Sequence, residues 1–197
     1  TDAVLSYMAQ SENNPSGVRP SAVSIAPYTG FFIAGAIIEA GTVASTTVSQ
    51  ILDMAEANVV REQINIGDNS TEESILAMIQ AHQAVANRHN LSMVSYEGGQ
   101  HIVQMNGNDN NVELGNKLIA ANRHPRMYSI YHSLMDAWFN NGGGVFIAYT
   151  GALTPSVAWG SFGTVEYLGQ DLSEAHKHRA LLDYLAQLSS SQLTRNR

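Results

Sequence analysis

The sequence predicts an α/β fold in which parallel strands alternate with helices. Three short apolar segments rich in β-branched residues (22–28, 91–97 and 144–150) are separated by longer stretches with helical periodicity. The three segments are apolar almost throughout, as expected of parallel strands buried on both faces. The alternation of strand and helix along the chain indicates parallel pairing.

Each predicted strand has a boundary signal. Pro27 limits how far the first strand continues, because proline cannot donate to a sheet ladder. Gly98 and Gly99 close the second strand, and the glycine run 142–144 precedes the third. We therefore expect all three strands to be short.

The predicted helices cover residues 47–61, 72–89, a segment from about Pro125 to Asn140, and 173–188. Glu72 and Glu73 suit the positive N-terminal end of the second helix. On the last helix, the residues expected to face inward are Leu181, Leu182, Leu185 and Leu188. We expect one domain over residues 1–188 and a polar, frayed tail over 189–197.

Composition excludes several classes of function. The net charge is −7 and Lys and Arg form no cluster, which argues against a nucleic-acid partner. The longest apolar run, 31–38, is too short to cross a membrane. The chain has no cysteine, so disulfides and thiolate metal sites are excluded. Only 14% of residues are charged, and Asn, Ser and Gly are plentiful, so we expect an extracellular or periplasmic protein. The start at Thr1 suggests a processed protein or a fragment.

The end of the second strand carries the strongest candidate for chemistry. In parallel α/β folds the functional groups lie at the carboxyl ends of strands. A period of two places Leu91, Met93, Ser95 and Glu97 on one face, with Glu97 last and two glycines after it. Burying a carboxylate there costs free energy unless the carboxylate accepts hydrogen bonds or takes part in the chemistry of the site. Glu97 is therefore either a catalytic group or a structural acceptor for loop amides.

Residues 96–101 (YEGGQH) resemble the seventh-strand end of bacterial clan-A-type glycoside hydrolase-like barrels, some of which carry a cellulose-binding description. Three more segments resemble the same family in the same order. Residues 25–28 (IAPY) resemble the preceding strand end, 121–127 (ANRHPRM) the start of a later helix, and 159–163 (WGSFG) with Glu166 the segment after the eighth strand. The resemblance spans about residues 20–185. It implies the C-terminal part, about strands six to eight, of a (β/α)8 TIM barrel.

The resemblance also implies a function, the hydrolysis of β-linked polysaccharide by retaining double displacement with Glu97 as nucleophile. A second carboxylic acid, about 5 Å from the nucleophile, protonates the leaving oxygen in such reactions. In the family this acid/base ends the fourth strand, so we expect it from a missing N-terminal half. Among the carboxylates of this chain, Glu39, Asp68 and Glu166 close no recognisable strand. Asp109 is the nearest substitute, and the alternative is a solvated loop residue.

Four further residues are candidates for substrate binding, namely Tyr28, Gln100, His101 and Trp159. Trp159 lies among glycines outside any helical stripe, and its ring could stack on a sugar or plug the barrel top. Tyr28 could bond Glu97, a sugar hydroxyl or a backbone group. Gln100 and His101 could line the same pocket, although a His beside a carboxylate is also a common structural pair.

The sequence predicts no metal site and no cofactor. His176 and His178 point to different faces of a helix, and the other His are scattered. The Asn-rich loop 106–111 lacks the EF-hand spacing that calcium sites use.

Three functions remain open from the sequence. The first is a hydrolase completed by an N-terminal half-barrel. The second is a non-catalytic protein that binds polysaccharide or oligosaccharide on a degenerate barrel, with Trp159 and Tyr28 as platforms. The third is a structural or assembly subunit, because a partial barrel leaves sheet edges that a partner chain or a second copy must cover.

Overall fold

The computed structural model describes residues 1–61, 63–65, 71–104 and 111–195. Its centre is a four-stranded sheet of β1 (Ala22–Ile25), β2 (Tyr28–Thr29), β5 (Ser92–Gln100) and β6 (Gly143–Ala148). The strand β5 lies in the middle, with β1 and β2 along one side and β6 along the other, and all of these pairings are parallel. The predicted α/β class with a parallel sheet is confirmed.

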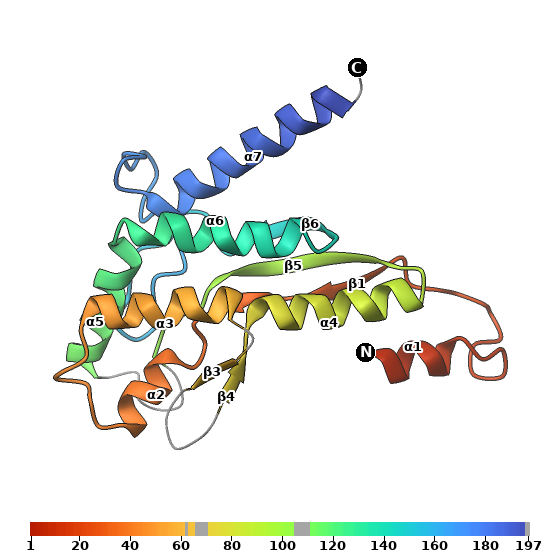
Figure 1. Cartoon of the computed structure of the whole chain (residues 1–197), viewed down its shortest axis with the longest axis horizontal. Helices are drawn as coiled ribbons and strands as arrows, with labels where there is room; N and C mark the ends of the chain where they lie inside the picture. Colours follow the sequence, from red (N-terminus) through yellow and green to blue (C-terminus); the bar gives the residue numbers. More distant parts are fainter. Residues whose placement is uncertain (62, 66–70, 105–110, 196–197) are drawn as a thin grey trace.

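The helices of the described residues connect and cover these strands (Figure 1). They are α1 (Asp2–Met8), α2 (Ile33–Glu39), α3 (Val48–Val60), α4 (Ile75–Arg88), α5 (Val112–Arg123), α6 (Arg126–Phe139) and α7 (His176–Arg195). Two further strands, β3 (Gln63–Asn65) and β4 (Thr71–Glu73), form a separate antiparallel pair between α3 and α4. Each long connection between neighbouring parallel strands therefore contains helices, as parallel pairing requires.

Proline divides the first predicted strand into two pieces. The pairing of β1 with β5 stops at Ile25, and pairing resumes at Tyr28 in β2. Pro27 has no N–H to donate, but its carbonyl accepts a hydrogen bond from the Gly99 N–H at 3.2 Å. The interruption therefore leaves β2 in place beside the end of β5.

Local capping sets the starts of two helices. Thr47 and Gln50 form a capping box at the start of α3, close to the predicted boundary. The predicted start of α4 was wrong, because Glu72 and Glu73 lie in β4 instead. Ser74 accepts a hydrogen bond from the Ala77 N–H and begins the helix two residues later than expected.

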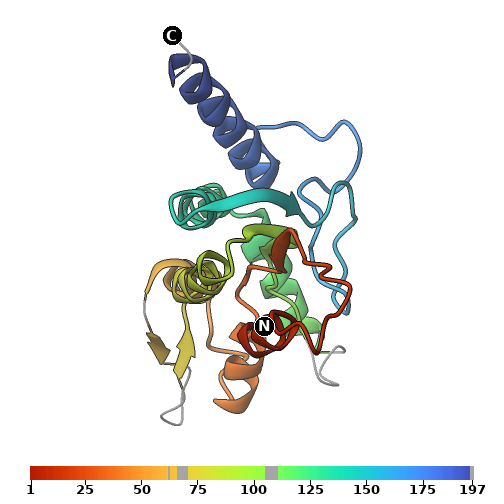
Figure 2. The same ribbon diagram turned by 90° about the vertical axis from the view of Figure 1, so that its right-hand side faces the viewer.

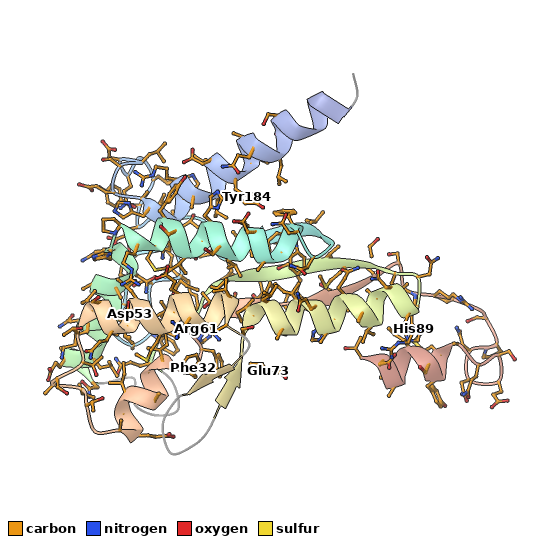
Figure 3. All side chains as sticks on the ribbon, in the orientation of Figure 1. Phe32, Asp53, Arg61, Glu73, His89 and Tyr184 are labelled. Carbon is orange, nitrogen blue, oxygen red and sulfur yellow. The ribbon has the colours of Figure 1, made fainter. Side chains whose placement is uncertain are left out.

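Three helices and the end of a fourth were not predicted. The unpredicted helices are α1, α2 and α5, and the resemblance segment 121–127 falls at the junction of α5 with α6. The last helix, α7, continues to Arg195 through most of the predicted polar tail. Leu185 was expected inside but is 60% exposed, because α7 projects away from the body after Tyr184 packs on α6 (Figures 1 and 3). The Tyr184 hydroxyl donates to Asp136 Oδ1 of α6 at 3.0 Å.

The core lies between one face of the sheet and the helices α3, α4 and α6, which gather on the same side of it (Figure 2). Trp138 of α6 is fully buried there, and its Nε1–H donates to the Gly144 carbonyl at 2.9 Å. Gly143 has to be small, because a Cβ would lie 2.4 Å from the Trp138 ring. The glycine run before β6 thus lets this strand pack directly on the indole.

The opposite face of the sheet is not covered by a helix layer in the described residues. Tyr96 of β5 and Val145 and Ile147 of β6 are exposed there, each by more than half of its surface. Sequence alone predicts parallel strands buried on both faces, so for this face the prediction was wrong within the described part of the chain. We call this surface, defined by Tyr96, Val145, Ile147 and the adjoining Tyr149, the bare face.

Candidate functional site

A bulge in β5 decides where Glu97 points. Ser95 pairs with Phe146 and Gly98 with Ala148, so three steps along β5 correspond to two along β6. One residue is therefore extra, and such bulges redirect the side chains beside them. A Cβ at Gly98 would lie 2.8 Å from the Phe146 ring, and Phe146 packs on Trp138 on the helix side. Glu97, one residue earlier, consequently faces the bare side.

The prediction that Glu97 shares a face with Met93 and Ser95 was therefore wrong. Met93 and Ser95 are buried on the helix side, whereas Glu97 is half-buried. The Ser95 hydroxyl donates to the Glu97 carbonyl at 2.7 Å and holds the bulged turn. Simple alternation cannot foresee an extra residue, since the bulge depends on pairing with β6.

Tyr28 and His101 are the polar neighbours of Glu97. Burial raises the pKa of the Tyr28 hydroxyl, and the charge of Glu97 and a hydrogen bond to it raise this pKa further. Burial lowers the pKa of His101 from its ordinary value, while the charge of Glu97 acts in the opposite direction. Two of the predicted binding residues thus lie within electrostatic reach of the predicted nucleophile.

Further aromatic rings contact Tyr28 and His101 at the carboxyl end of the sheet. His101 lies 5.5 Å from the Tyr28 ring, 4.9 Å from Phe31 and 5.2 Å from Phe162, between ring centroids. Tyr149 completes the group at 5.5 Å from Phe162. We call Glu97 together with these five residues the rim cluster.

The rim cluster combines one carboxylate with ring surfaces that solvent reaches. Phe31 is 57% exposed and Tyr149 is 41% exposed. The Tyr149–Thr150 peptide bond is cis, and the Thr150 N–H donates to the Phe162 carbonyl at 3.1 Å. The rim cluster therefore combines partly exposed apolar ring surfaces with a half-buried acid at one edge of the sheet.

Gln100 has a different placement from its neighbours. It is buried, its Nε2 donates to the Ser161 carbonyl at 2.9 Å, and its Oε1 accepts from the Ile102 N–H at 2.7 Å. Both ends of the amide are therefore engaged by backbone. Gln100 ties the loop after β6 to the end of β5, and its role in substrate binding stays a prediction that these bonds do not favour.

Trp159 lies outside the rim cluster. It sits in a turn closed by Ser156 and Gly160, which exchange backbone hydrogen bonds of 2.9 and 2.8 Å. The ring is 78% exposed, and it makes no contact with another aromatic ring in the described residues. Trp159 is not buried by the described residues, and both readings of it, stacking on a sugar and plugging the barrel top, stay predictions.

The other carboxylates considered from sequence lie elsewhere. Glu166 accepts two hydrogen bonds from Arg123, at 2.6 and 2.9 Å. Glu39 is exposed at the end of α2. Asp68 and Asp109 lie outside the described residues, as does most of the Asn-rich loop 106–111. The acid/base that the resemblance requires therefore has no candidate in contact with Glu97 among these described groups.

Metal ligation and membrane insertion can be examined for the described residues. They contain no group of three or more His, Asp or Glu that could hold a metal ion. The His178 ring instead pairs with Thr164 Oγ1 through Nδ1 at 3.2 Å. Within the same described ranges, no helix has the length and apolar character needed to span a membrane.

Four residues at this end of the molecule were missed from sequence. Tyr149 and Phe162 belong to the rim cluster. The sequence signal for Tyr149 is its position directly after a strand. Phe31 begins the longest apolar run of the chain, 31–38, and nothing in that run marks it as a site residue. Lys177, almost fully buried at the start of α7, carries no sequence signal that distinguishes it from a solvated helix lysine.

Comparison of the chain with protein-family models, with curated proteins and with solved structures finds no match.

Proposed function

We propose that this chain is the C-terminal part of a (β/α)8 barrel of glycoside hydrolase type, in which Glu97 is the nucleophile of a retaining reaction. The observation that supports the barrel is the order of strands. The first strand (β1 with β2), β5 and β6 are neighbours in chain order and all parallel, and among the described residues helices cover one face only. A doubly wound sheet has helices on both faces, whereas a barrel has them only outside.

The bare face and the sheet edges support completion by further strands. In the described residues β6 pairs only with β5, and β1 pairs only with β5, so each has an unpaired edge. The exposed Val145 and Ile147 would line the interior of a closed barrel, where bulky branched residues are typical. We propose an N-terminal half-barrel as the missing part. A second copy of this chain is the alternative partner.

The rim cluster supplies the chemistry. The Glu97 carboxylate would attack the anomeric carbon and form a glycosyl ester, with the Tyr28 hydroxyl beside it. The rings of Tyr149 and Phe31 would contact the sugar, and the missing half would supply the acid/base. Polysaccharide or oligosaccharide is the proposed substrate class, and an extracellular or periplasmic location accords with it.

Aryl glycosides with an activated leaving group test this assignment in the chain itself. A dinitrophenolate departs without protonation, so the missing acid/base is not needed for the first step. We expect slow release of dinitrophenol from a β-glycoside, reduced at least 100-fold by Glu97→Gln and unchanged by Glu39→Gln, which alters an exposed carboxylate. Release that is equal in the wild type and in Glu97→Gln contradicts the proposal.

A non-catalytic carbohydrate-binding protein is the second candidate, and the exposed ring of Trp159 favours it. This function predicts retention on immobilised β-glucan that Trp159→Ala abolishes and Glu97→Gln leaves intact, without any product. Trp138→Phe is no suitable control because that ring is core. Tyr167→Ala is suitable because it removes another exposed aromatic ring from the same loop.

A further inference from the structure

A small, partly open hollow lies between the end of α5, the loop after β6 and the first turn of α7. Ser161 and Lys177 line it, together with Arg123 and His176. The segment 160–164 separates this hollow from the rim cluster, because Phe162 belongs to the rim and its neighbour Ser161 faces the hollow. The hollow is therefore distinct from the rim cluster.

Lys177 is the unusual group in this hollow. Only 6% of it is exposed, and its Nζ donates to Asn122 Oδ1 at 3.2 Å and to the Ser161 carbonyl. In its protonated form the amine has three N–H donors, so in that form one remains without an acceptor in the described residues. No carboxylate forms an ion pair with Lys177 in this part of the chain. A buried cation without a counter-ion is costly, which indicates that a partner is missing.

Ser161 gives an independent sign of a missing partner. Its side chain is 4% exposed, and its Oγ has no hydrogen-bond partner among the described residues. Buried hydroxyls are nearly always paired, so an unpaired one lining a hollow points to a bound ligand or water. The Nδ1 atom of His176, on the same wall, is likewise buried and unpaired.

The start of α7 adds backbone donors. Ala175, which precedes the helix, has a methyl side chain that cannot accept a hydrogen bond. The Arg179 N–H donates to the Ala175 carbonyl at 2.9 Å. The N–H groups of residues 176–178 find no acceptor in the described residues. Such free donors, at the positive end of the helix dipole, favour an anion.

The charged groups near Lys177 do not remove the preference of the hollow for an anion. The charge of Glu166 raises the pKa of Lys177, against the larger effect of burial. Both carboxylate oxygens of Glu166 accept hydrogen bonds from Arg123. Glu174 is exposed to solvent. Burial lowers the pKa of His176 from its ordinary value, and the charges of Arg179 and His124 lower it further.

We propose that this hollow is a binding site for a small oxyanion, such as inorganic phosphate or a free carboxylate, held by Lys177 Nζ, the Ser161 hydroxyl and the first-turn N–H groups of α7. All of these groups donate, so the ligand has to be an acceptor. The site is independent of the hydrolase proposal. Burial lowers the pKa of Lys177 to about 7, and a bound anion favours the protonated form. Binding therefore takes up a proton at neutral pH.

NMR on the whole chain tests the site. Inorganic phosphate and acetate are titrated separately at pH 7 and at constant ionic strength in chloride. We expect saturable shifts of the Ser161, His176 and Lys177 amides, and a rise in the Lys177 pKa measured on its Cε resonance. Because the chain has only two lysines, Lys117 and Lys177, the two Cε signals are readily assigned. A response to phosphate alone, or to acetate alone, identifies which oxyanion the hollow accepts.

Two variants and one matched control decide the outcome. Lys177→Met and Ser161→Ala should each weaken binding about tenfold or more, which corresponds to one lost hydrogen bond to a charged group. Lys117→Met removes the same charge at a partly exposed position paired with Glu113, and it should bind as the wild type does. Ser161→Ala leaves the Ser161 carbonyl in place, so it remains informative if Lys177→Met does not fold. No saturable response, or equal affinity in Ser161→Ala and wild type, overturns the proposal.

Discussion

Replacing Lys177 by Met should change how the stability of this protein depends on pH. Burial lowers the pKa of this lysine from 10.5 to about 7. Each pKa unit corresponds to about 1.36 kcal/mol, so keeping the ammonium buried costs about 5 kcal/mol at low pH. The folded state binds fewer protons than the unfolded state between pH 7 and 10.5. The free energy of unfolding of the wild type therefore rises with pH in that window, and the cost is fully present below pH 7.

Met has a similar length but no charge, so the variant lacks this dependence. It also leaves Asn122 Oδ1 without the Nζ donor, a pH-independent loss of about 1–3 kcal/mol. The variant should thus be the more stable protein at pH 6 and lose that advantage toward pH 10. Between pH 6 and 9 the difference in unfolding free energy should change by about 3 kcal/mol. For a chain of this size that corresponds to a relative shift in Tm of roughly 6–12 °C.

Urea unfolding followed by circular dichroism at pH 6, 7, 8 and 9 measures this difference. Lys117→Met is the matched control, because its ammonium keeps contact with solvent and pairs with Glu113. The two variants have the same net charge, so a difference between their pH profiles reports on the buried site. A Lys177→Met variant whose stability stays parallel to that of the wild type over this range would refute the reasoning.

Further predictions concern packing, capping and titration. Gly163→Ala should lower the unfolding free energy by about 3 kcal/mol, because its Cβ would lie 2.3 Å from the Val165 carbonyl oxygen. Gly151→Ala is the control and should lower it far less, because the space around its Cβ is open. Equal urea midpoints for the two variants would contradict this packing. Thr47→Ala should lower the unfolding free energy by about 1 kcal/mol through loss of the capping box, and an unchanged urea midpoint would argue against that box. The His101 ring should titrate below the ordinary histidine pKa in a ¹H–¹⁵N NMR titration, since burial disfavours its charged form. Its contribution to stability should therefore rise as pH increases through the ordinary histidine range, and a pKa above that range would contradict the burial.

The parts of the fold that local sequence determines were predictable. The three apolar segments became the sheet strands, and Thr47 with Gln50 started a helix near its expected place. Helices without a strong apolar stripe, such as α1 and α2, escaped prediction because each is only seven residues long. The projection of α7 was not predictable either, since its sequence carries leucines that tertiary packing leaves exposed.

The candidate site was predictable in part. Glu97 was found from its place at a strand end, and Tyr28 and His101 lie beside it as expected. The direction in which Glu97 points depends on a bulge, which arises from pairing with a strand about 50 residues away and has no local signature. The backbone contacts of Gln100 were not predictable for a related reason, because its partners Ser161 and Ile102 become neighbours only when two loops meet.

Covalent trapping is the most direct test of Glu97 as the nucleophile. The dinitrophenolate of a dinitrophenyl 2-deoxy-2-fluoro-β-glycoside leaves without protonation, so the missing acid/base is not needed. The fluorine slows hydrolysis of the glycosyl ester, so the adduct should accumulate. Intact mass spectrometry should then show one added sugar per chain, and peptide mapping should find it on Glu97 and not on Glu166, whose oxygens Arg123 holds. An unmodified Glu97 with sugar attached at another carboxylate would contradict the account.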